Sequence, residues 1–187
     1  MRLRTLTPLL ALAMATPAFA QHFNQNVLLN VHVGALVPQE SSKIELDGLT
    51  TSGKQKSGYD VGLSLQVLHS ERFSTRWGWS YASQDLDIDA LPNEKFQRNY
   101  STFYIQGLFS LVNGVGKNWY LLAGGIHQTR TIEWEGYSDE ADKVRSAGFQ
   151  VGTGLSFNSG AFRLAPELIY QQAGKEGSFL ARVNFGF

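Results

Sequence analysis

Apolar and polar residues alternate with a period of two in the last eleven residues of the chain, GSFLARVNFGF (177–187). Counting back from the end, every second residue is apolar: Phe187, Phe185, Val183, Ala181 and Phe179. A period of two predicts a β-strand whose two faces meet different surroundings. A strand of about 9–11 residues with one apolar face can cross a bilayer with that face toward lipid.

The same alternation recurs along the chain, which predicts eight strands of this kind. The segments are 26–37, 58–69, 73–84, 99–112, 118–130, 145–158, 161–171 and 177–187. Only the fifth segment, 118–130, has a weak pattern. We favour an outward face of Tyr120, Leu122, Gly124 and Ile126 there, and the opposite phase stays open.

The connections between these segments differ in length from one end to the other. The tight connections are 70–72, 113–117 and 158–160, and they alternate with the connections 38–57, 85–98, 131–146 and 172–176. Short turns on one side and longer loops on the other are typical of bacterial outer-membrane barrels. The prediction is therefore an all-β fold, an eight-stranded antiparallel transmembrane β-barrel with up-and-down meander topology. A soluble lipocalin-type barrel would have an apolar interior and a polar outside, the reverse of the faces assigned here.

The N-terminal residues have the features of a signal peptide. Arg2 and Arg4 precede a short apolar stretch, and Ala18-Phe19-Ala20 is a small-x-small cleavage site. We expect a signal peptide over 1–20 and one barrel domain over 21–187. No run of 18 apolar residues follows, so no transmembrane helix is expected. The 16 basic residues are balanced by 16 acidic ones, which argues against nucleic acid as a partner.

Several segments resemble a known family when taken together. They are NVLLNVHVGALV, WYLLAGGIHQ, FQVGTGLSF, FRLAPELIYQ and the ending LARVNFGF. The chain resembles the small eight-stranded bacterial outer-membrane β-barrels, the OmpA/OmpX-like and opacity-type proteins. The resemblance implies export to the outer membrane, contact with its lipid and lipopolysaccharide, and a last strand read by the barrel assembly machinery. The residues that would form this assembly signal are Phe179, Val183, Phe185 and Phe187.

The family includes adhesins, resistance factors, small-solute channels and a few lipid A-modifying enzymes. The expected function is that of a structural or interaction protein whose extracellular loops meet a ligand or a host surface. A narrow small-solute channel is the alternative, and a lipid A-modifying enzyme is a third hypothesis. We expect a non-enzyme without cofactor.

Four charged residues have the inward phase and are candidates for ion pairs in the lumen: Asp60, Arg76, Glu167 and Arg182. Glu167 and Arg182 are placed symmetrically about the last hairpin, so they should face and bind each other across the two strands. Buried charges need partners, and an eight-stranded interior is narrow. Paired charges there would form a plug, and the alternative is a gate on a solute path.

Neither a metal site nor a catalytic site follows from the sequence. Asp85, Asp87 and Asp89 alternate as in a calcium loop, but Ala90 replaces the glycine that an EF-hand requires. We therefore assign no metal ligand.

The best candidate for a catalytic base is His127. Ser146 and Glu133 would be its partners in a Ser–His–acid arrangement. Nothing near these residues marks a nucleophile, so no catalytic residue is assigned.

Overall fold

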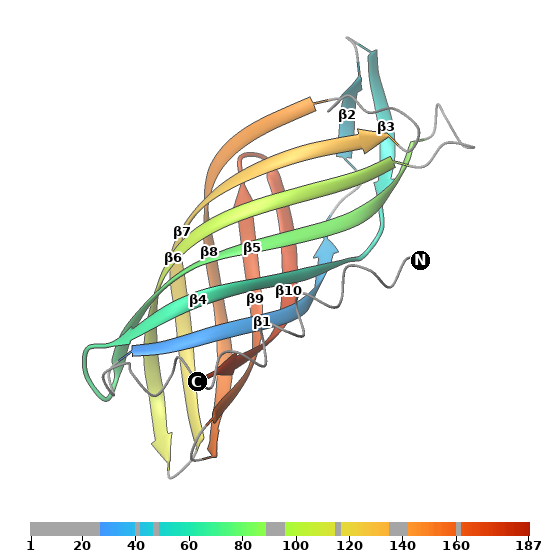
Figure 1. The fold of residues 1–187 in the computed structure, drawn as a ribbon. Coiled ribbons are helices and arrows are strands. Elements are labelled where there is room, and N and C mark those ends of the chain that lie inside the picture. Colours follow the sequence, from blue (N-terminus) through green and yellow to red (C-terminus); the bar gives the residue numbers. More distant parts are fainter. Residues whose placement is uncertain are drawn as a thin grey trace.

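The computed structural model describes residues 27–39, 42–46, 49–88, 96–114, 117–134, 142–159 and 162–187. Within these ranges ten strands form one antiparallel sheet (Figure 1). They are β1 (Val27–Pro38), β2 (Ser42–Leu46), β3 (Leu49–Gln55), β4 (Gly58–Leu68), β5 (Phe73–Ile88), β6 (Phe96–Gly114), β7 (Lys117–Trp134), β8 (Asp142–Ser159), β9 (Phe162–Ala173) and β10 (Glu176–Gly186). No helix in the described part of the chain is long and apolar enough to cross a membrane. The expected signal peptide, 1–20, lies outside the described residues.

Eight of these strands, β1 and β4 to β10, form a closed barrel. Each is antiparallel to its neighbours, and β1 pairs with β10 from Asn30↔Gly186 to Pro38↔Ser178. The predicted eight-stranded antiparallel transmembrane barrel is confirmed. Closure matters because an open sheet edge would leave backbone N–H and C=O groups without partners in lipid.

The outer surface of the barrel is apolar. Large hydrophobic side chains that point outward are 37–58% exposed in the isolated chain, and they occur on every barrel strand. Examples are Val33, Leu63, Trp77, Phe103, Leu121, Val151, Leu168 and Phe185. A soluble protein rarely exposes so large a continuous apolar surface, whereas a barrel in a bilayer presents it to lipid.

The outward and inward faces follow the predicted alternation in every strand except β7. There the favoured phase is wrong: Tyr120, Leu122 and Ile126 are buried inside, while Trp119 and Leu121 point outward. The run Trp119–Ala123 is apolar throughout, so alternation alone does not distinguish its two faces. The choice is decided by hydrogen bonding, because the hydroxyl of Tyr120 has a partner inside the barrel.

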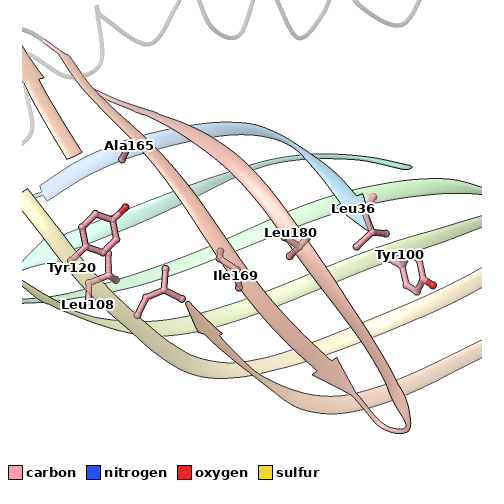
Figure 2. Close-up of a cluster of buried hydrophobic side chains, with 9 residues drawn as sticks. Leu36, Tyr100, Leu108, Tyr120, Ala165, Ile169 and Leu180 are labelled. Atoms are coloured by element: carbon pink, nitrogen blue, oxygen red, sulfur yellow. The ribbon is translucent and has the colours of Figure 1, made fainter. Parts of the chain in front are cut away.

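The lumen is filled by side chains and contains more apolar residues than the sequence predicts. Figure 2 shows a cluster of nine buried residues that runs along the interior. Among them, Leu36, Ile169 and Leu180 are at most 2% exposed. The interior of an eight-stranded barrel is just wide enough for its own side chains, so these residues fill the space between the polar groups.

The two ends of the barrel differ, and we call them the loop end and the turn end. The loop end carries the connections β1–β4, β5–β6, β7–β8 and β9–β10; the turn end carries the others. Strands β5 to β8 are 16–19 residues long, whereas β1, β4, β9 and β10 have 11 or 12. The extra length of these strands lies mainly at the loop end, where the β5–β6 and β7–β8 hairpins continue as a ladder through residues that the sequence analysis assigns to the connections 85–98 and 131–146.

The predicted connection 38–57 contains a hairpin that the sequence analysis missed. Strands β2 and β3 pair with each other, and β3 pairs with β5 from Gly53↔Ile88 to Gln55↔Leu86. Strand β3 thus takes the place of β4 beside β5 beyond the point where the β4–β5 ladder ends, at Tyr59↔Ser83.

The apolar outer side chains form a belt around the barrel. This belt predicts that the free-energy cost of a charge on the outer face depends on where the residue lies along its strand. Ile105 and Gln97 both point outward on β6, and Ile105 is 50% exposed within the belt. Ile105→Arg should lower the free energy of unfolding by about 2–4 kcal/mol, because the guanidinium would enter the hydrocarbon. Gln97→Arg lies in the polar extension and should cost about 0–1 kcal/mol.

Urea unfolding from lipid vesicles measures both values. Equal costs at the two positions would contradict the placement of the belt.

Candidate functional site

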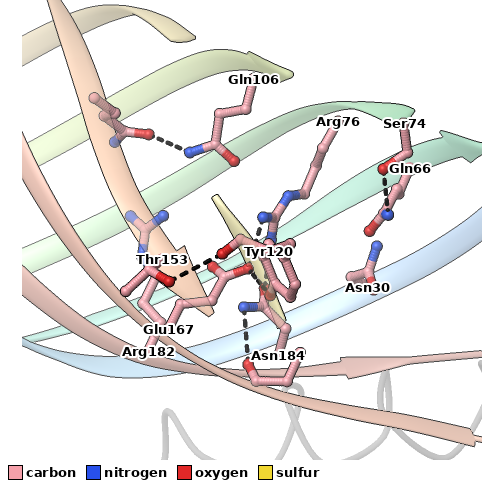
Figure 3. A network of polar contacts seen from close by, with 12 residues as sticks. Asn30, Gln66, Ser74, Arg76, Gln106, Tyr120, Thr153, Glu167, Arg182 and Asn184 are labelled. Atoms are coloured by element: carbon pink, nitrogen blue, oxygen red, sulfur yellow. Dashed lines mark hydrogen bonds and ion pairs between the residues drawn. The ribbon is translucent and has the colours of Figure 1, made fainter. Parts of the chain in front are cut away.

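An ion pair between Arg76 on β5 and Glu167 on β9 crosses the lumen (Figure 3). Arg76 Nη2 lies 2.6 Å from Glu167 Oε1, and the Tyr120 hydroxyl donates to the same oxygen at 2.5 Å. Arg76 Nη1 donates to Asn184 Oδ1 at 3.2 Å. Both charged side chains are almost fully buried. Charges removed from water in this way need opposite charges and hydrogen bonds close by, and this cluster supplies both.

A second ion pair joins Arg182 on β10 to Asp60 on β4. Arg182 Nε lies 2.6 Å from Asp60 Oδ2, and Nη2 lies 3.2 Å from Oδ1, which is the two-point geometry in which guanidinium and carboxylate match. Arg182 Nη2 also donates to Ser80 Oγ at 3.3 Å, and the guanidinium lies 5.5 Å from the centre of the Tyr104 ring. His32 Nε2 is 3.3 Å from Asp60 Oδ2. The carboxylate is therefore contacted by side chains from β1 and β10, and the guanidinium by side chains from β5 and β6.

The four candidate charges lie together in the lumen, but they pair differently from the expectation. Arg182 stands opposite Glu167 in the β9–β10 register, as their symmetric placement predicts. The direct ion pair between them is nevertheless wrong, because Glu167 binds Arg76 and Arg182 binds Asp60. Gly34 of β1 explains why Arg182 binds Asp60.

Gly34 is the register partner of both Asp60 and Arg182. It has no side chain, so Arg182 extends over it to reach Asp60. A Cβ at position 34 would lie 3.0 Å from Arg182 Cγ and 2.5 Å from the carbonyl oxygen of Ala181.

Polar contacts also close the turn end of the lumen. Arg163 Nη1 donates to Gln66 Oε1 at 3.1 Å, and Gln66 Nε2 donates to Ser74 Oγ at 2.8 Å. The guanidinium of Arg163 lies 5.5 Å from the centre of the Tyr120 ring. A cavity among the described residues at this end has a volume of about 50 Å³.

The loop end holds a larger cavity, which we call the vestibule. Its volume is about 680 Å³. The lining includes Gln84 and Tyr100 on the longer strands β5 and β6, and Gln171 and Glu176 on the shorter strands β9 and β10. The two ion pairs described above lie deeper in the lumen, so the vestibule ends within the barrel.

The candidate catalytic arrangement is not assembled. His127 is exposed on the outer face, whereas Ser146 lines the vestibule inside. Ser146 is the register partner of Gln128, the residue after His127, and adjacent residues of a strand point to opposite faces. A Ser–His–acid relay through these residues is therefore excluded by the register.

The candidate calcium ligands are also separated from one another. Asp87 binds Lys56 at 2.9 Å, Asp85 is exposed on the outer face, and Asp89 lies outside the described residues. Within the described ranges, no group of three or more acidic, histidine or cysteine side chains is arranged to hold a metal ion.

The fold has clear counterparts among solved structures. The outer membrane protein OprG from Pseudomonas aeruginosa matches with a TM-score of 0.62 at 12% sequence identity, over 87% of this chain and 95% of OprG. Neisserial surface protein A matches with a TM-score of 0.58 at 10% identity, over 86% of this chain and 95% of its own. The chain has the fold of the small eight-stranded outer-membrane β-barrels.

The N-terminal β-barrel domain of Pseudomonas aeruginosa OprF belongs to the same group, with a TM-score of 0.55 at 18% identity, over 87% of this chain and 97% of that domain. No protein-family model and no curated protein matches the sequence. At these identities the likeness concerns the barrel itself, and the specific role has to be argued from the residues of this chain.

Sequence reasoning missed the neutral members of the lumen network, namely His32, Ser80, Tyr104, Tyr120 and Asn184. All five are at most 2% exposed. The signal that could have found them is the requirement that every buried charge has hydrogen-bonding neighbours. In an eight-stranded barrel, inward polar residues at similar heights are the groups that can meet this requirement.

Double-mutant cycles can identify the true charge partners. Glu167→Gln and Arg76→Met should each destabilise the barrel by about 3–5 kcal/mol, because each leaves an opposite charge without its partner in the lumen. The double variant should recover part of this loss, which gives a coupling energy of about 0.5–3 kcal/mol in urea unfolding.

The matched control is the cycle of Glu167→Gln with Arg182→Met, and its coupling should be the smaller of the two. A larger coupling in the control cycle would restore the direct Glu167–Arg182 pair and contradict the network described here.

Proposed function

We propose that this chain is a non-enzymatic recognition protein of the bacterial outer membrane, with its loop end facing outward. At the loop end, β3 and residues 84–88, 96–98, 130–134 and 142–146 of β5 to β8 extend beyond the shorter strands, and we call this part the protruding sheet. The observation that carries the proposal is this protruding sheet, together with a lumen closed by paired charges. An outer-membrane barrel places its longer connections outside and its short turns in the periplasm, which gives the orientation.

The protruding sheet is an ordered structure with two different faces. Its inner face carries an apolar cluster of Leu86, Ile88, Phe96 and Ile132, each at most 2% exposed. Its outer face carries exposed polar and charged residues: Asp85, Asp87, Gln97, Glu133, Lys143 and Arg145. Lys56 binds Asp87 on this face, and that hydrogen bond raises the pKa of the amine. A rigid, hydrated surface above the lipid suits recognition.

The protruding sheet also has an edge where β8 extends beyond β9. The β7–β8 ladder continues to Ile132↔Asp142, whereas the β8–β9 ladder begins only at Gly148↔Ala173. Residues 144–146 of β8 thus have a ladder partner on one side among the described strands. Such an edge can add an extended segment of a partner through backbone hydrogen bonds.

The packing of side chains in the lumen favours a recognition role over a channel for solutes. A channel through this barrel would have to pass two ion pairs and the surrounding apolar side chains, and the cavity at the turn end is small. Separating such charges without new partners is costly. A lipid A-modifying enzyme is disfavoured because the candidate base and its serine lie on opposite faces of the wall.

Trimming the protruding sheet tests the proposal. The β5–β6 hairpin would be shortened to the pair Ser83↔Asn99 and the β7–β8 hairpin to Thr129↔Arg145, each closed by a two-residue turn. The trimmed barrel should assemble, because its lipid-facing belt is intact. Cells that carry it should lose the retention on host-cell and matrix surfaces that the full-length barrel confers on a deletion strain.

Equal retention of the two strains would contradict the recognition role. The purified full-length barrel should show no conductance steps in planar bilayers, and regular steps would favour the small-solute channel instead.

In this proposal the last strand, with Phe179, Val183, Phe185 and Phe187 on its apolar face, is the segment that the assembly machinery reads. Phe187 also closes the barrel, because its backbone N–H donates to the Leu29 carbonyl at 2.9 Å and its carbonyl accepts from Leu29 N–H at 3.2 Å. Phe187→Ala keeps both hydrogen bonds and removes only the ring. It should lower the amount of folded barrel in the outer membrane while the exported protein accumulates in the periplasm.

Leu155→Ala is the control for this experiment, since it removes an apolar side chain of the outer face on β8. If both variants reach the membrane at the wild-type level, Phe187 is not part of an assembly signal.

A further inference from the structure

The vestibule is lined by an unusual number of neutral amide side chains. Six glutamines line it: Gln39, Gln55, Gln84, Gln128, Gln171 and Gln172. Each amide presents both donors and an acceptor. The volume of about 680 Å³ lies within the range of about 300–1,000 Å³ that is typical of small-molecule sites.

The charged side chains of the lining are partly paired with one another. Arg130 and Glu176 both line the vestibule and form an ion pair. The same carboxylate also accepts from Arg98 at 3.4 Å. Lys175 lies in the exposed turn between β9 and β10, at the rim. The described lining thus has two cationic side chains, Arg130 and Lys175, and one carboxylate, and the ion pair engages Arg130 with that carboxylate.

Gln84 supplies a polar atom without a partner. Its Nε2 donates to Gln55 Oε1 at 2.8 Å and to the Tyr100 hydroxyl at 3.0 Å, so both amide hydrogens are used. Its Oε1 is buried and has no hydrogen-bond partner among the described residues. A buried acceptor left in this state carries a free-energy cost that a bound donor would remove.

The neighbouring amides are held in place by side chains of adjacent strands. Gln128 Nε2 donates to Thr102 Oγ1 at 3.1 Å. Gln171 accepts from Gln150 at 3.0 Å, and Gln150 accepts in turn from Gln106. Side chains fixed by such contacts lose little further freedom when a ligand binds, which favours affinity.

We propose that the vestibule is a binding site for a short neutral saccharide of about two sugar units. Hydroxyl groups are donors and acceptors at once, as glutamine amides are, so a ligand rich in hydroxyls can satisfy several of them together. Tyr100 adds an aromatic side chain to the same lining. Gln84 Oε1 would accept a hydrogen bond from one ligand hydroxyl.

The vestibule lies inside the barrel and shares Gln84, Arg130 and Val144 with the protruding sheet, whose outer face carries the proposed recognition. The site depends on the proposed function only for the outward orientation of the loop end. Binding to the purified barrel is independent of that orientation. A failure of the full-length barrel to bind saccharide would leave recognition by the outer face of the protruding sheet standing, and equal surface retention of the two strains would leave saccharide binding by the full-length barrel standing.

The test uses the full-length barrel in lipid nanodiscs, with maltose and N,N′-diacetylchitobiose as neutral probes and a sulfated disaccharide as the anionic comparison. Saturation-transfer NMR reports contact, and titration gives the dissociation constant. At least one neutral probe should bind with a dissociation constant of about 1 mM or lower. Gln84→Met should weaken that binding about tenfold, since it removes the acceptor.

Gln66→Met is the matched control, because Gln66 is equally buried and hydrogen-bonded but lies at the turn end. It should leave the dissociation constant unchanged. Ser146→Phe provides a second route if Gln84→Met does not fold: Ser146 is half-buried in the lining, and the larger ring should take up part of the vestibule and weaken binding. The proposal is overturned if neither neutral probe binds, if only the sulfated disaccharide binds, or if the variants at 84 and 146 bind as the wild type does.

Discussion

Backbone hydrogen bonding in a medium without water is the constraint on which this structure depends. Each strand that crosses hydrocarbon must find partners for its N–H and C=O groups on both sides, and only a closed sheet provides them. The β1–β10 ladder completes the ring, and the two hydrogen bonds between Leu29 and Phe187 extend it to the turn end. Once the ring is closed, every strand has one face toward lipid and one toward the lumen. The period-two pattern of the sequence follows from that division.

Closure also determines the chemistry of the lumen. Eight strands enclose a space that side chains fill, so a charge pointing inward has little access to bulk water. Arg76, Glu167, Arg182 and Asp60 can be accommodated because they form two ion pairs with further hydrogen bonds from neutral neighbours. A buried ion pair contributes little net stability compared with apolar packing, but removal of one partner is costly. The network therefore fixes the arrangement inside the barrel and separates the vestibule from the turn end.

The parts of the fold that the sequence predicts are those that depend on the contrast between lipid and lumen. The eight strands and the faces of seven of them follow from alternation. Strand β7 is the exception, because Trp119–Ala123 is apolar throughout and the inward position of Tyr120 depends on a carboxylate from β9. The hairpin β2–β3 lies beyond the lipid, where alternation is no longer enforced.

The lumen contacts can also be predicted only in part. Some depend on a single hairpin, and others depend on strands that are distant in the sequence. The register of Glu167 and Arg182 follows from the symmetry of a single hairpin. Their actual partners depend on the stagger of the closed barrel and on Gly34, whose missing side chain lets Arg182 reach Asp60. A glycine at an inward position between two opposite charges was the available signal, but it could be used only once the three strands were known to be adjacent.

The central claim is that the barrel has a vestibule at its outward-facing loop end and is closed deeper in the lumen. The chain has no cysteine, so single cysteines can report access without interference. Ser146→Cys places a thiol in the vestibule, and Ser110→Cys places one in the small cavity at the turn end. A membrane-impermeant maleimide added to intact cells should label Cys at the first position and leave the second unlabelled until the outer membrane is permeabilised. Equal labelling of both positions in intact cells would contradict the closed lumen, and labelling of the second position alone would contradict the orientation.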